Sequence, residues 1–115
     1  MVAPAAGTVV LVPFPFSDLS RAKLRPAVVL AEAGRGDWIL SQITSKSYAD
    51  AAAVSLRAAD FAKGSLQLDS YVRPGKLFTA HQSLLAAEAG RLKAEACEKV
   101  ISAVVRLLRA GTAHQ

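Results

Sequence analysis

The chain has 115 residues, of which 52% are hydrophobic and 20% are charged. This composition supports one domain with a packed core, and it lacks the low hydrophobicity and high charge of disordered chains. Fourteen Lys and Arg against nine Asp and Glu leave a formal charge of +5. That excess favours a polyanionic partner without choosing among RNA, DNA, a membrane surface or an acidic peptide. We expect a single globular domain over residues 1–115.

Cysteine, histidine and long apolar segments, which mark disulfide-rich, metal-binding and membrane proteins, are scarce or absent in this sequence. Cys97 is the only cysteine, so an internal disulfide, a Cys-rich zinc site and a CxxC redox pair are excluded. His81 and His114 are too few and too far apart in sequence to indicate a metal site. The N-terminus lacks a signal-peptide pattern, and no segment approaches the roughly 20 apolar residues of a membrane span. We therefore expect a cytoplasmic protein with no metal, no cofactor and no membrane association.

The first 45 residues predict three strands separated by turn-forming residues. The first strand is β-branched and apolar and is ended by Pro13 and Pro15, which cannot donate ladder hydrogen bonds. A polar loop over Ser17–Arg25 follows, and the turn at Arg35–Asp37 separates the second strand from the third. The three predicted strands are Thr8–Val12, Pro26–Ala31 and Trp38–Thr44.

The middle of the chain predicts further short elements. Val54–Arg57 is typical of a fourth strand, and Ala58–Lys63 fits one helical turn ended by Gly64. Leu66–Val72 alternates apolar and polar residues, as a half-buried strand does. Arg73, Pro74 and Gly75 then predict a turn that leads into Lys76–Ala80.

From Lys93 the hydrophobic period changes to that of a helix. Acidic residues Glu95 and Glu98 lie near its start and basic residues near its end, which suits the helix dipole, and Gly111 is placed to end it before a frayed tail, Thr112–Gln115. The apolar face consists of Cys97, Val100, Ile101, Val104, Val105 and Leu108. Short strands followed by one helix predict a mainly β fold, a small antiparallel barrel or strongly curved sheet with a C-terminal helix packed against it.

The segment Pro13–Arg25 (PFPFSDLSRAKLR) is the most unusual in composition. It places Phe14, Phe16, an acid and three basic residues in one predicted loop. Aromatic rings stack on bases while cations meet phosphates, so this mixture favours single-stranded nucleic acid. The alternative is that both phenylalanines fold into the core and the charged residues are simply solvated.

Three further positions carry groups suited to phosphate chemistry. Arg25 precedes Pro26, which favours extended backbone, and its guanidinium suits a phosphate or the charged transition state of phosphoryl transfer. The hydroxyls of Thr44 and Ser45 could donate to a phosphate oxygen or simply bond turn backbone. Asp69 could bind a ribose 2'-hydroxyl, orient Arg25 or be a surface carboxylate. Each residue taken alone also fits an ordinary surface role.

Three segments together resemble the toxins of the MazF/PemK family. Gly7–Ala31 (GTVVLVPFPFSDLSRAKLRPAVVLA) is similar to the opening of these toxins, with a Gly-led strand, a Pro and aromatic loop, an Arg-Pro pair and an apolar strand. Ile39–Lys46 (ILSQITSK) resembles a second motif that ends in Thr-Ser, and Gly64–Leu77 (GSLQLDSYVRPGKL) a third with an acid before a Val-Arg step. Arg73–Lys76 departs from the more usual Arg-Thr-Ile-Asp continuation, which favours the PemK-like branch.

The resemblance implies an SH3-like barrel of the CcdB/MazF/PemK kind, a homodimer and a metal-independent, sequence-preferring endoribonuclease that cleaves single-stranded RNA or mRNA. It assigns catalytic roles to Arg25, Thr44 and Asp69. The residues that it implies for RNA binding are Phe14, Phe16, Ser17, Asp18, Arg21, Lys23, Ser45, Gln67 and Arg73. A cognate antitoxin of the MazE/PemI kind would silence the enzyme by placing an acidic or hydrophobic tail in the groove between Phe14 and Arg25.

As a hypothesis, the ribose 2'-hydroxyl attacks the adjacent phosphate and gives a 2',3'-cyclic phosphate and a 5'-hydroxyl end. Arg25 and Thr44 would stabilise the charge on the non-bridging oxygens. Arginine is a poor base at neutral pH because its pKa is above about 12, so no general base is assigned.

Two other functions remain open on sequence alone. Barrel toxins of the CcdB kind bind DNA gyrase and cleave nothing, so the fold by itself does not decide between the two activities. A non-catalytic module, either an SH3-like peptide reader or a toxin that has lost its nuclease, is the second alternative. Gln67 favours it, because some members of the family carry an arginine at that position.

Overall fold

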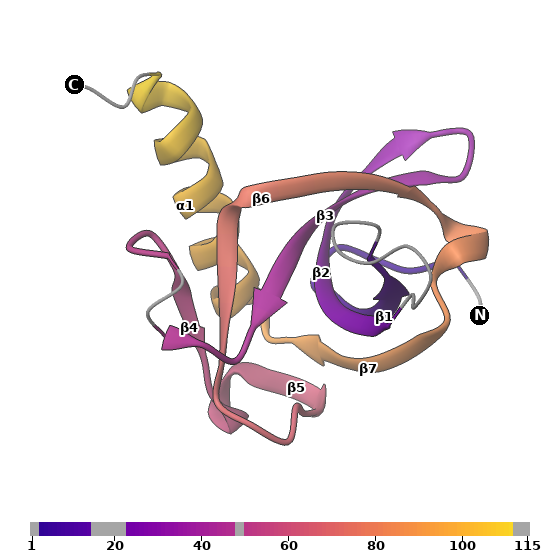
Figure 1. Ribbon diagram of the computed structural model, residues 1–115, viewed down its shortest axis with the longest axis horizontal. Helices are drawn as coiled ribbons and strands as arrows, with labels where there is room; N and C mark the ends of the chain where they lie inside the picture. Colours follow the sequence, from indigo (N-terminus) through magenta and orange to yellow (C-terminus); the bar gives the residue numbers. More distant parts are fainter. Residues whose placement is uncertain (1–2, 15–22, 48–49, 112–115) are drawn as a thin grey trace.

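The computed structural model describes residues 3–14, 23–47 and 50–111 and consists of a curled antiparallel sheet with a C-terminal helix (Figure 1). The strands are ordered β4-β6-β3-β2-β1-β7-β5 across the sheet, which confirms the mainly β barrel-like fold expected from the sequence. The elements are β1 (Thr8–Pro13), β2 (Leu24–Gly34), β3 (Asp37–Thr44), β4 (Val54–Leu56), η2 (Ala58–Asp60), β5 (Phe61–Gly64), β6 (Ser70–His81), η3 (Gln82–Leu84), β7 (Ala87–Leu92) and α1 (Ala94–Ala110).

Strand β1 is buried on both faces because the sheet curls around it. Successive side chains of a strand point to opposite faces, so Val9 joins one core cluster while Val10 and Val12 join the other. All three are at most 1% exposed. The uninterrupted apolar run Thr8–Val12 is therefore the sequence signature of a central, doubly covered strand.

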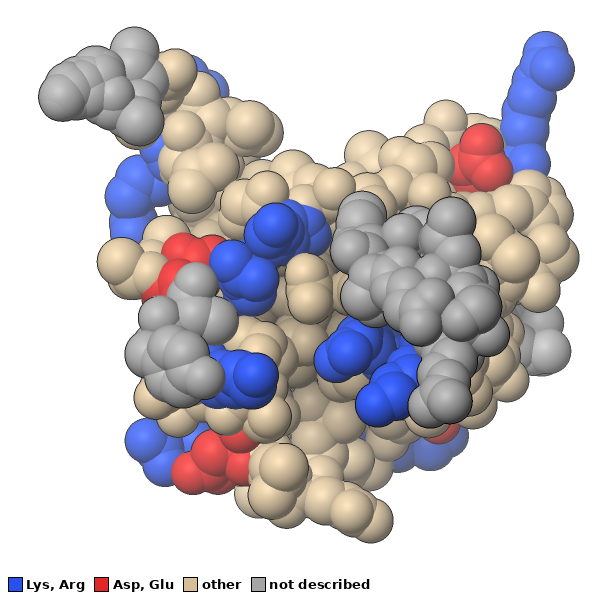
Figure 2. Space-filling view, viewed as in Figure 1, with Lys and Arg blue, Asp and Glu red and all other residues tan. Residues whose placement is uncertain are grey.

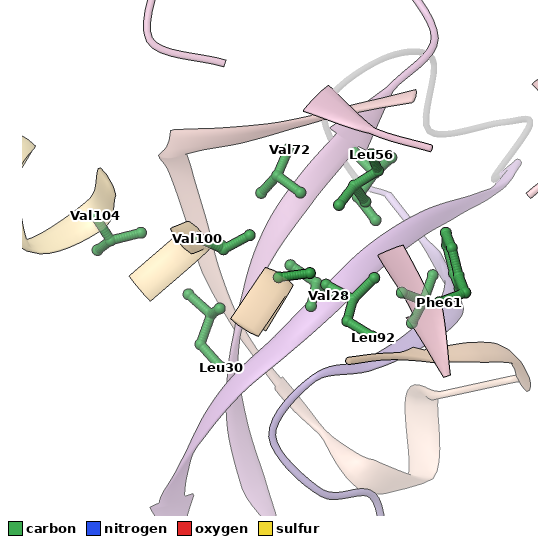
Figure 3. Packing of buried hydrophobic residues seen from close by; sticks show 11 residues of the cluster. Val28, Leu30, Leu56, Phe61, Val72, Leu92, Val100 and Val104 are labelled. Atoms are coloured by element: carbon green, nitrogen blue, oxygen red, sulfur yellow. The ribbon is translucent and has the colours of Figure 1, made fainter. Parts of the chain in front are cut away.

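Helix α1 closes the first cluster (Figure 3). Val100 and Val104 point from the helix toward strand residues that include Leu30 and Val72, and Val100 is fully buried. The helix ends at Gly111, whose φ of 71° is in the left-handed region that glycine adopts without strain. The predicted C-terminal helix and its glycine end are thus confirmed; the predicted tail, Thr112–Gln115, lies outside the described residues.

The end of α1 extends past the sheet, as Figure 1 shows. Three apolar side chains in this last part of the helix are exposed: Val105 and Leu107 at 41% and Leu108 at 63%. Val105 and Leu108 were expected on the buried face with Val100 and Val104. The amphipathic period is therefore correct, but within this chain only the first part of that face is covered.

Strand β6 corrects the prediction of two strands joined by a turn at Arg73–Gly75. One strand runs through this segment from Ser70 to His81, and Leu66–Asp69 precede it as irregular chain. The partner of Ser41 on β6 is Leu77, whereas the partner of Ile43, two residues on, is Val72. Pro74 thus lies in an irregular part of the ladder, where its missing N–H costs no regular hydrogen bond.

Two other elements differ from expectation. The predicted helical turn Ala58–Lys63 is limited to η2, and Phe61 begins the edge strand β5 instead. Strand β7 was not predicted, because its sequence AEAGRL has low β-propensity; it forms by pairing with β1 and β5. At Gly64, a Cβ would lie only 2.3 Å from the carbonyl oxygen of Ala89, so glycine permits this close approach of β5 to β7.

No helix in the described part of the chain is long and apolar enough to cross a membrane.

The core assignment predicts unequal effects for two Leu→Ala substitutions. Leu56 is 2% exposed inside the cluster, whereas Leu84 is 51% exposed on η3. Leu56→Ala should lower the free energy of unfolding by about 2–5 kcal/mol through lost burial and a residual cavity, and Leu84→Ala should change it by no more than about 0.5 kcal/mol. Urea titrations at one protein concentration measure both. Equal losses would contradict the assignment of Leu56 to the core.

Candidate active site

A groove of about 520 Å³ opens where the N-terminal end of β2 meets the C-terminal end of β3. Its apolar lining comes from four strands and from the segment before β6, and consists of Leu11, Pro26, Ile43, Leu66, Leu68 and Ala89. Its polar lining consists of Arg25, Gln42, Thr44, Ser45, Lys46, Ser65, Gln67 and Ser70. We call this feature the Arg25–Thr44 groove.

Strand pairing brings Arg25 and Thr44 to the same groove. β2 and β3 are antiparallel, and Ala27 is the partner of Gln42. Arg25 precedes Ala27 by two residues and Thr44 follows Gln42 by two, so both residues lie toward the same end of the strand pair. Arg25 is exposed and Thr44 is half-buried, which leaves a cation accessible beside a hydroxyl held by the strand.

The hydroxyl of Thr44 has a defined local bond. Its Oγ1 accepts a hydrogen bond from the backbone N–H of Lys46 at 3.1 Å. This is the turn-stabilising role that Thr commonly takes at a strand end. Because the oxygen accepts, the hydroxyl proton remains able to donate to another group, such as a phosphate oxygen.

The groove has a positive electrostatic character. Arg25 and Lys46 line it, and none of its described lining residues carries a carboxylate. Figure 2 shows several Lys and Arg side chains near the middle of the face that it draws. Hydroxyls and amides supply the other polar groups, so an anionic, hydrogen-bonding ligand fits the lining well.

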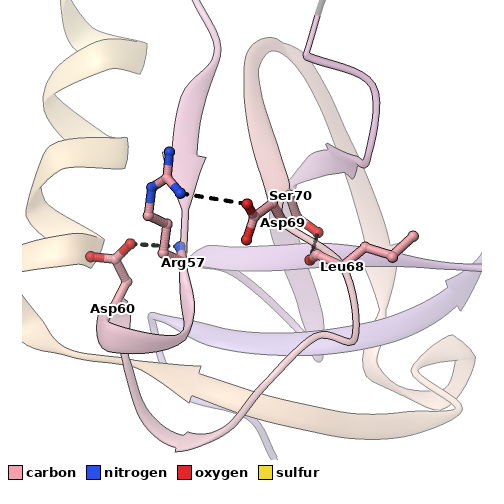
Figure 4. Close-up of polar contacts among 5 residues, drawn as sticks. All are labelled: Arg57, Asp60, Leu68, Asp69 and Ser70. Atoms are coloured by element: carbon pink, nitrogen blue, oxygen red, sulfur yellow. Dashed lines mark hydrogen bonds and ion pairs between the residues drawn. The ribbon is translucent and has the colours of Figure 1, made fainter.

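Asp69 lies at the edge of the Arg25–Thr44 groove, and its side chain faces Arg57 (Figure 4). Its Oδ2 is 3.4 Å from Nη1 of Arg57, and both side chains are about two-thirds exposed. Asp60 accepts a hydrogen bond from the backbone N–H of Arg57 at 2.8 Å. Asp69 does not contribute to the described lining of the groove, so the structure connects it to Arg57 rather than to Arg25.

Arg73 is also engaged away from the groove lining. Its Nε is 3.5 Å from Oδ2 of Asp50, and only 22% and 19% of the two side chains are exposed. The backbone carbonyl of Arg73 accepts a hydrogen bond from the hydroxyl of Ser41 at 2.6 Å.

The structure places Phe14 in the second core cluster. Its ring is 5% exposed and packs edge-to-face against Phe78, with ring centroids 5.0 Å apart. This matches the alternative in which the phenylalanine folds into the core, and a ring so buried has no open face on which a base could stack. Lys23 is exposed but is not part of the described groove lining. Phe16, Ser17, Asp18 and Arg21 lie outside the described residues.

Cys97 lies on α1, outside the groove lining. Burial raises the pKa of its thiol, and the nearby negative charge of Glu98 raises it further. A thiol held in its neutral form is a poor nucleophile at neutral pH. Among residues 3–14, 23–47 and 50–111, no three His, Cys, Asp or Glu side chains are grouped as a metal site would require.

Comparison with protein families identifies the kind of protein to which this groove belongs. Residues 5–108 match the family described as the PemK-like, MazF-like toxins of type II toxin–antitoxin systems. The chain belongs to this family. A search among curated proteins finds no match.

Solved structures with the same fold agree with the family assignment. A MazE–MazF complex from Deinococcus radiodurans matches with a TM-score of 0.75 and 22% identity, over 95% of this toxin and 98% of that chain. A mycobacterial endoribonuclease in complex with its cognate antitoxin matches with a TM-score of 0.71 and 17% identity, over 95% and 96%. The Mycobacterium tuberculosis toxin MazF-mt6 has a TM-score of 0.69 and 17% identity, over 89% and 96%.

The fold gathers only part of the predicted site of this toxin. Arg25, Thr44, Ser45 and Gln67 share the groove, whereas Asp69 and Arg73 pair with other residues. Sequence reasoning missed Gln42, Lys46, Ser65 and Ser70 in the lining. Gln42 could have been found, because it precedes Thr44 by two residues and therefore lies on the same strand face.

Proposed function

We propose that this toxin is a metal-independent, sequence-preferring endoribonuclease that cleaves single-stranded RNA, including mRNA, and thereby inhibits translation and growth. The observation that carries the proposal is the Arg25–Thr44 groove, which combines two cations with hydroxyl and amide groups and has no carboxylate among its described lining. This chemistry suits a phosphodiester with its bases and 2'-hydroxyl groups. Family membership supports the same conclusion.

The reaction we propose uses the RNA's own nucleophile. The ribose 2'-oxygen attacks the adjacent phosphorus and loses its proton, the bond from phosphorus to the 5'-oxygen breaks, and that oxygen takes up a proton. The products are a 2',3'-cyclic phosphate and a 5'-hydroxyl end. Arg25 places a permanent positive charge, and Thr44 a hydroxyl donor, near the non-bridging oxygens on which negative charge increases in the transition state.

The other groove residues supply binding rather than chemistry. Ser45 and Gln67 offer hydrogen bonds, and Lys46 adds a second cation for phosphate. Gln67 is an exposed amide that can read a base edge as donor and acceptor. We propose that the uncharged amide of Gln67 affects which RNA sequences are preferred. The reaction itself then needs no second arginine at position 67.

A gyrase-binding activity is the less favoured alternative. It shares the fold but makes no use of a cationic groove with a hydroxyl beside the arginine. The match to the PemK-like, MazF-like family over residues 5–108 supports the nuclease instead.

We also propose that a cognate antitoxin silences the toxin by occupying the same groove in the cytosol. Complexes with an antitoxin are named for structural relatives from mycobacteria and Deinococcus radiodurans. An acidic tail would pair with Arg25 and Lys46, and its apolar residues would contact Leu66 and Leu68. Antitoxin and non-cleavable RNA should then compete for binding; simultaneous binding of both would contradict this proposal.

The exposed end of α1 supports a homodimer. Val105, Leu107 and Leu108 form an apolar surface that the described chain leaves uncovered, and obligate dimers commonly bury such surfaces. A second copy of the chain is the partner we propose for this helix end.

Cleavage by variants tests the roles of the groove residues. With EDTA present, Arg25→Ala and Thr44→Val should each lower the rate of cleavage of a long single-stranded RNA by roughly 100-fold to 1,000-fold, because each removes one group that stabilises transition-state charge. Primer extension of the products measures the rate and the cleavage motif. Arg35→Asn is the matched control, since Arg35 is exposed in the β2–β3 turn at a φ of 57° that Asn tolerates. Wild-type rates in both groove variants would refute the proposed roles.

The dimer proposal makes a separate prediction. Leu108→Glu places a charge on the uncovered end of α1 and should shift the protein from dimer to monomer in sedimentation equilibrium. Leu84→Glu makes the same change at another exposed leucine, on η3, and should leave the mass of the dimer unchanged. A wild-type protein that stays monomeric at high micromolar concentration would rule out the dimer.

A further inference from the structure

Arg73 is expected from the family resemblance to bind RNA, but its guanidinium faces a carboxylate of the same chain. The Nε–Oδ2 distance to Asp50 is 3.5 Å, and about four-fifths of each side chain is buried. By comparison, the Arg57–Asp69 pair has a similar distance but side chains that are 68% and 65% exposed. The Arg73–Asp50 pair is thus far more shielded from water, and an ion pair shielded in this way is stronger and less sensitive to salt.

Arg73 contacts the chain on both sides of the segment that carries Thr44. Its backbone carbonyl accepts a hydrogen bond from Ser41 at 2.6 Å, and Ser41 is fully buried on β3. Its guanidinium meets Asp50, whose Oδ1 accepts a hydrogen bond from the backbone N–H of Ala52 at 2.9 Å. One residue of β6 therefore holds β3 just before the groove residues and the chain just after them.

These contacts occur where the regular ladder between β3 and β6 is interrupted. The pairing is shifted between Ser41 and Ile43 on β3, opposite the stretch from Val72 to Leu77 on β6. Beyond this interruption Ile43 and Thr44 pair again with Val72 and Tyr71 on β6. The pairing of β3 with β2 ends at Gln42, so in the described chain the end of β3 that bears Thr44 is paired on one side only. The hydrogen bond that Ser41 donates to the Arg73 carbonyl and the ion pair of Arg73 with Asp50 add contacts at this position.

We propose that Arg73 and Asp50 are positioning residues that hold Thr44 in the geometry needed for cleavage, and that neither residue contacts the RNA. The inference rests on the proposed nuclease function. A phosphate that bound Nε of Arg73 would have to displace a largely buried carboxylate, and only 22% of the arginine side chain is exposed, whereas Arg25 is exposed in the groove and needs no such exchange. The energetic cost of that displacement favours positioning over direct binding.

The decisive experiment compares Arg73→Gln, Asp50→Asn and the double variant with Arg35→Asn as control. We expect each single substitution to lower kcat on saturating RNA by on the order of tenfold to a hundredfold, because small displacements of a catalytic group have effects of this size. The double variant should be no slower than the slower single variant, since both remove the same pair. Affinity of Asp50→Asn for an RNA with a 2'-deoxy cleavage site should equal that of the wild type within about twofold.

Direct RNA binding by Arg73 predicts a different pattern. Arg73→Gln would then weaken binding and reduce the slope of log affinity against log salt by about 0.7, the value for one lost phosphate contact on a single strand. Asp50→Asn would keep the wild-type kcat. Either result would overturn the proposal.

A readout that needs no activity separates this inference from the nuclease proposal. The N–H of Lys46 donates to Thr44 Oγ1, so its hydrogen exchange reports the order of this turn. Exchange should be faster in both single variants and unchanged in Arg35→Asn; unchanged exchange in Asp50→Asn would refute positioning even if the wild type cleaves no RNA. Circular dichroism checks that each variant is folded. If Arg73→Gln unfolds, Arg73→Lys replaces it; because lysine keeps a positive charge facing Asp50, its kcat should be lower than that of the wild type but higher than that of Asp50→Asn.

Discussion

Strand β3 lies between β2 and β6, and its register against both strands decides where the groove residues lie. On one side, Ala27 opposite Gln42 fixes the register that brings Arg25 and Thr44 to one groove. On the other side, Val72 opposite Ile43 begins a shifted register. A slip of one residue on β3 would turn Thr44 to the opposite face of the sheet. The apolar side chains that lock β3 in place, such as Leu40 and Ile43, are therefore also what positions the proposed catalytic groups.

The core and the site use the same strands for different purposes. Val28 and Val29 on β2 are fully buried in the two clusters, while Arg25, a few residues earlier on the same strand, is exposed. Rigid strands hold the first residues of β2 and the last residues of β3, where the backbone leaves the core and polar side chains become accessible. This arrangement gives precise placement without burying an unpaired charge.

The sequence predicted elements whose local pattern and tertiary environment agree. β1 is rich in β-branched residues, β2 and β3 each contain an apolar run, and α1 has both a helical period and a glycine end, so each was predictable. β7 was not, because its residues favour no strand by themselves and pairing with β1 and β5 decides the structure. Likewise, Pro74 and Gly75 predict a turn, but the shifted register lets one strand pass through them.

For the candidate site, too, local sequence patterns predicted only part of what the structure shows. Motif resemblance assigned Arg25 and Thr44, which the structure places in one groove. It equally assigned Phe14 and Arg73, whose environments depend on Phe78 and Asp50, residues distant in sequence that no local pattern connects to them. Residue type and spacing can nominate a chemical group, whereas only the packed chain determines which groups remain accessible to a ligand.

If the RNA supplies its own nucleophile in the Arg25–Thr44 groove, cleavage must depend on the 2'-hydroxyl beside the scissile phosphate. An RNA oligonucleotide with one mapped cleavage site is incubated with the toxin in EDTA, beside the same oligonucleotide with a 2'-deoxy sugar on the 5' side of the scissile phosphate. We expect a 2',3'-cyclic phosphate and a 5'-hydroxyl from the first oligonucleotide and no cleavage of the second. Efficient cleavage of the deoxy substrate, or products with a 5'-phosphate, would contradict it.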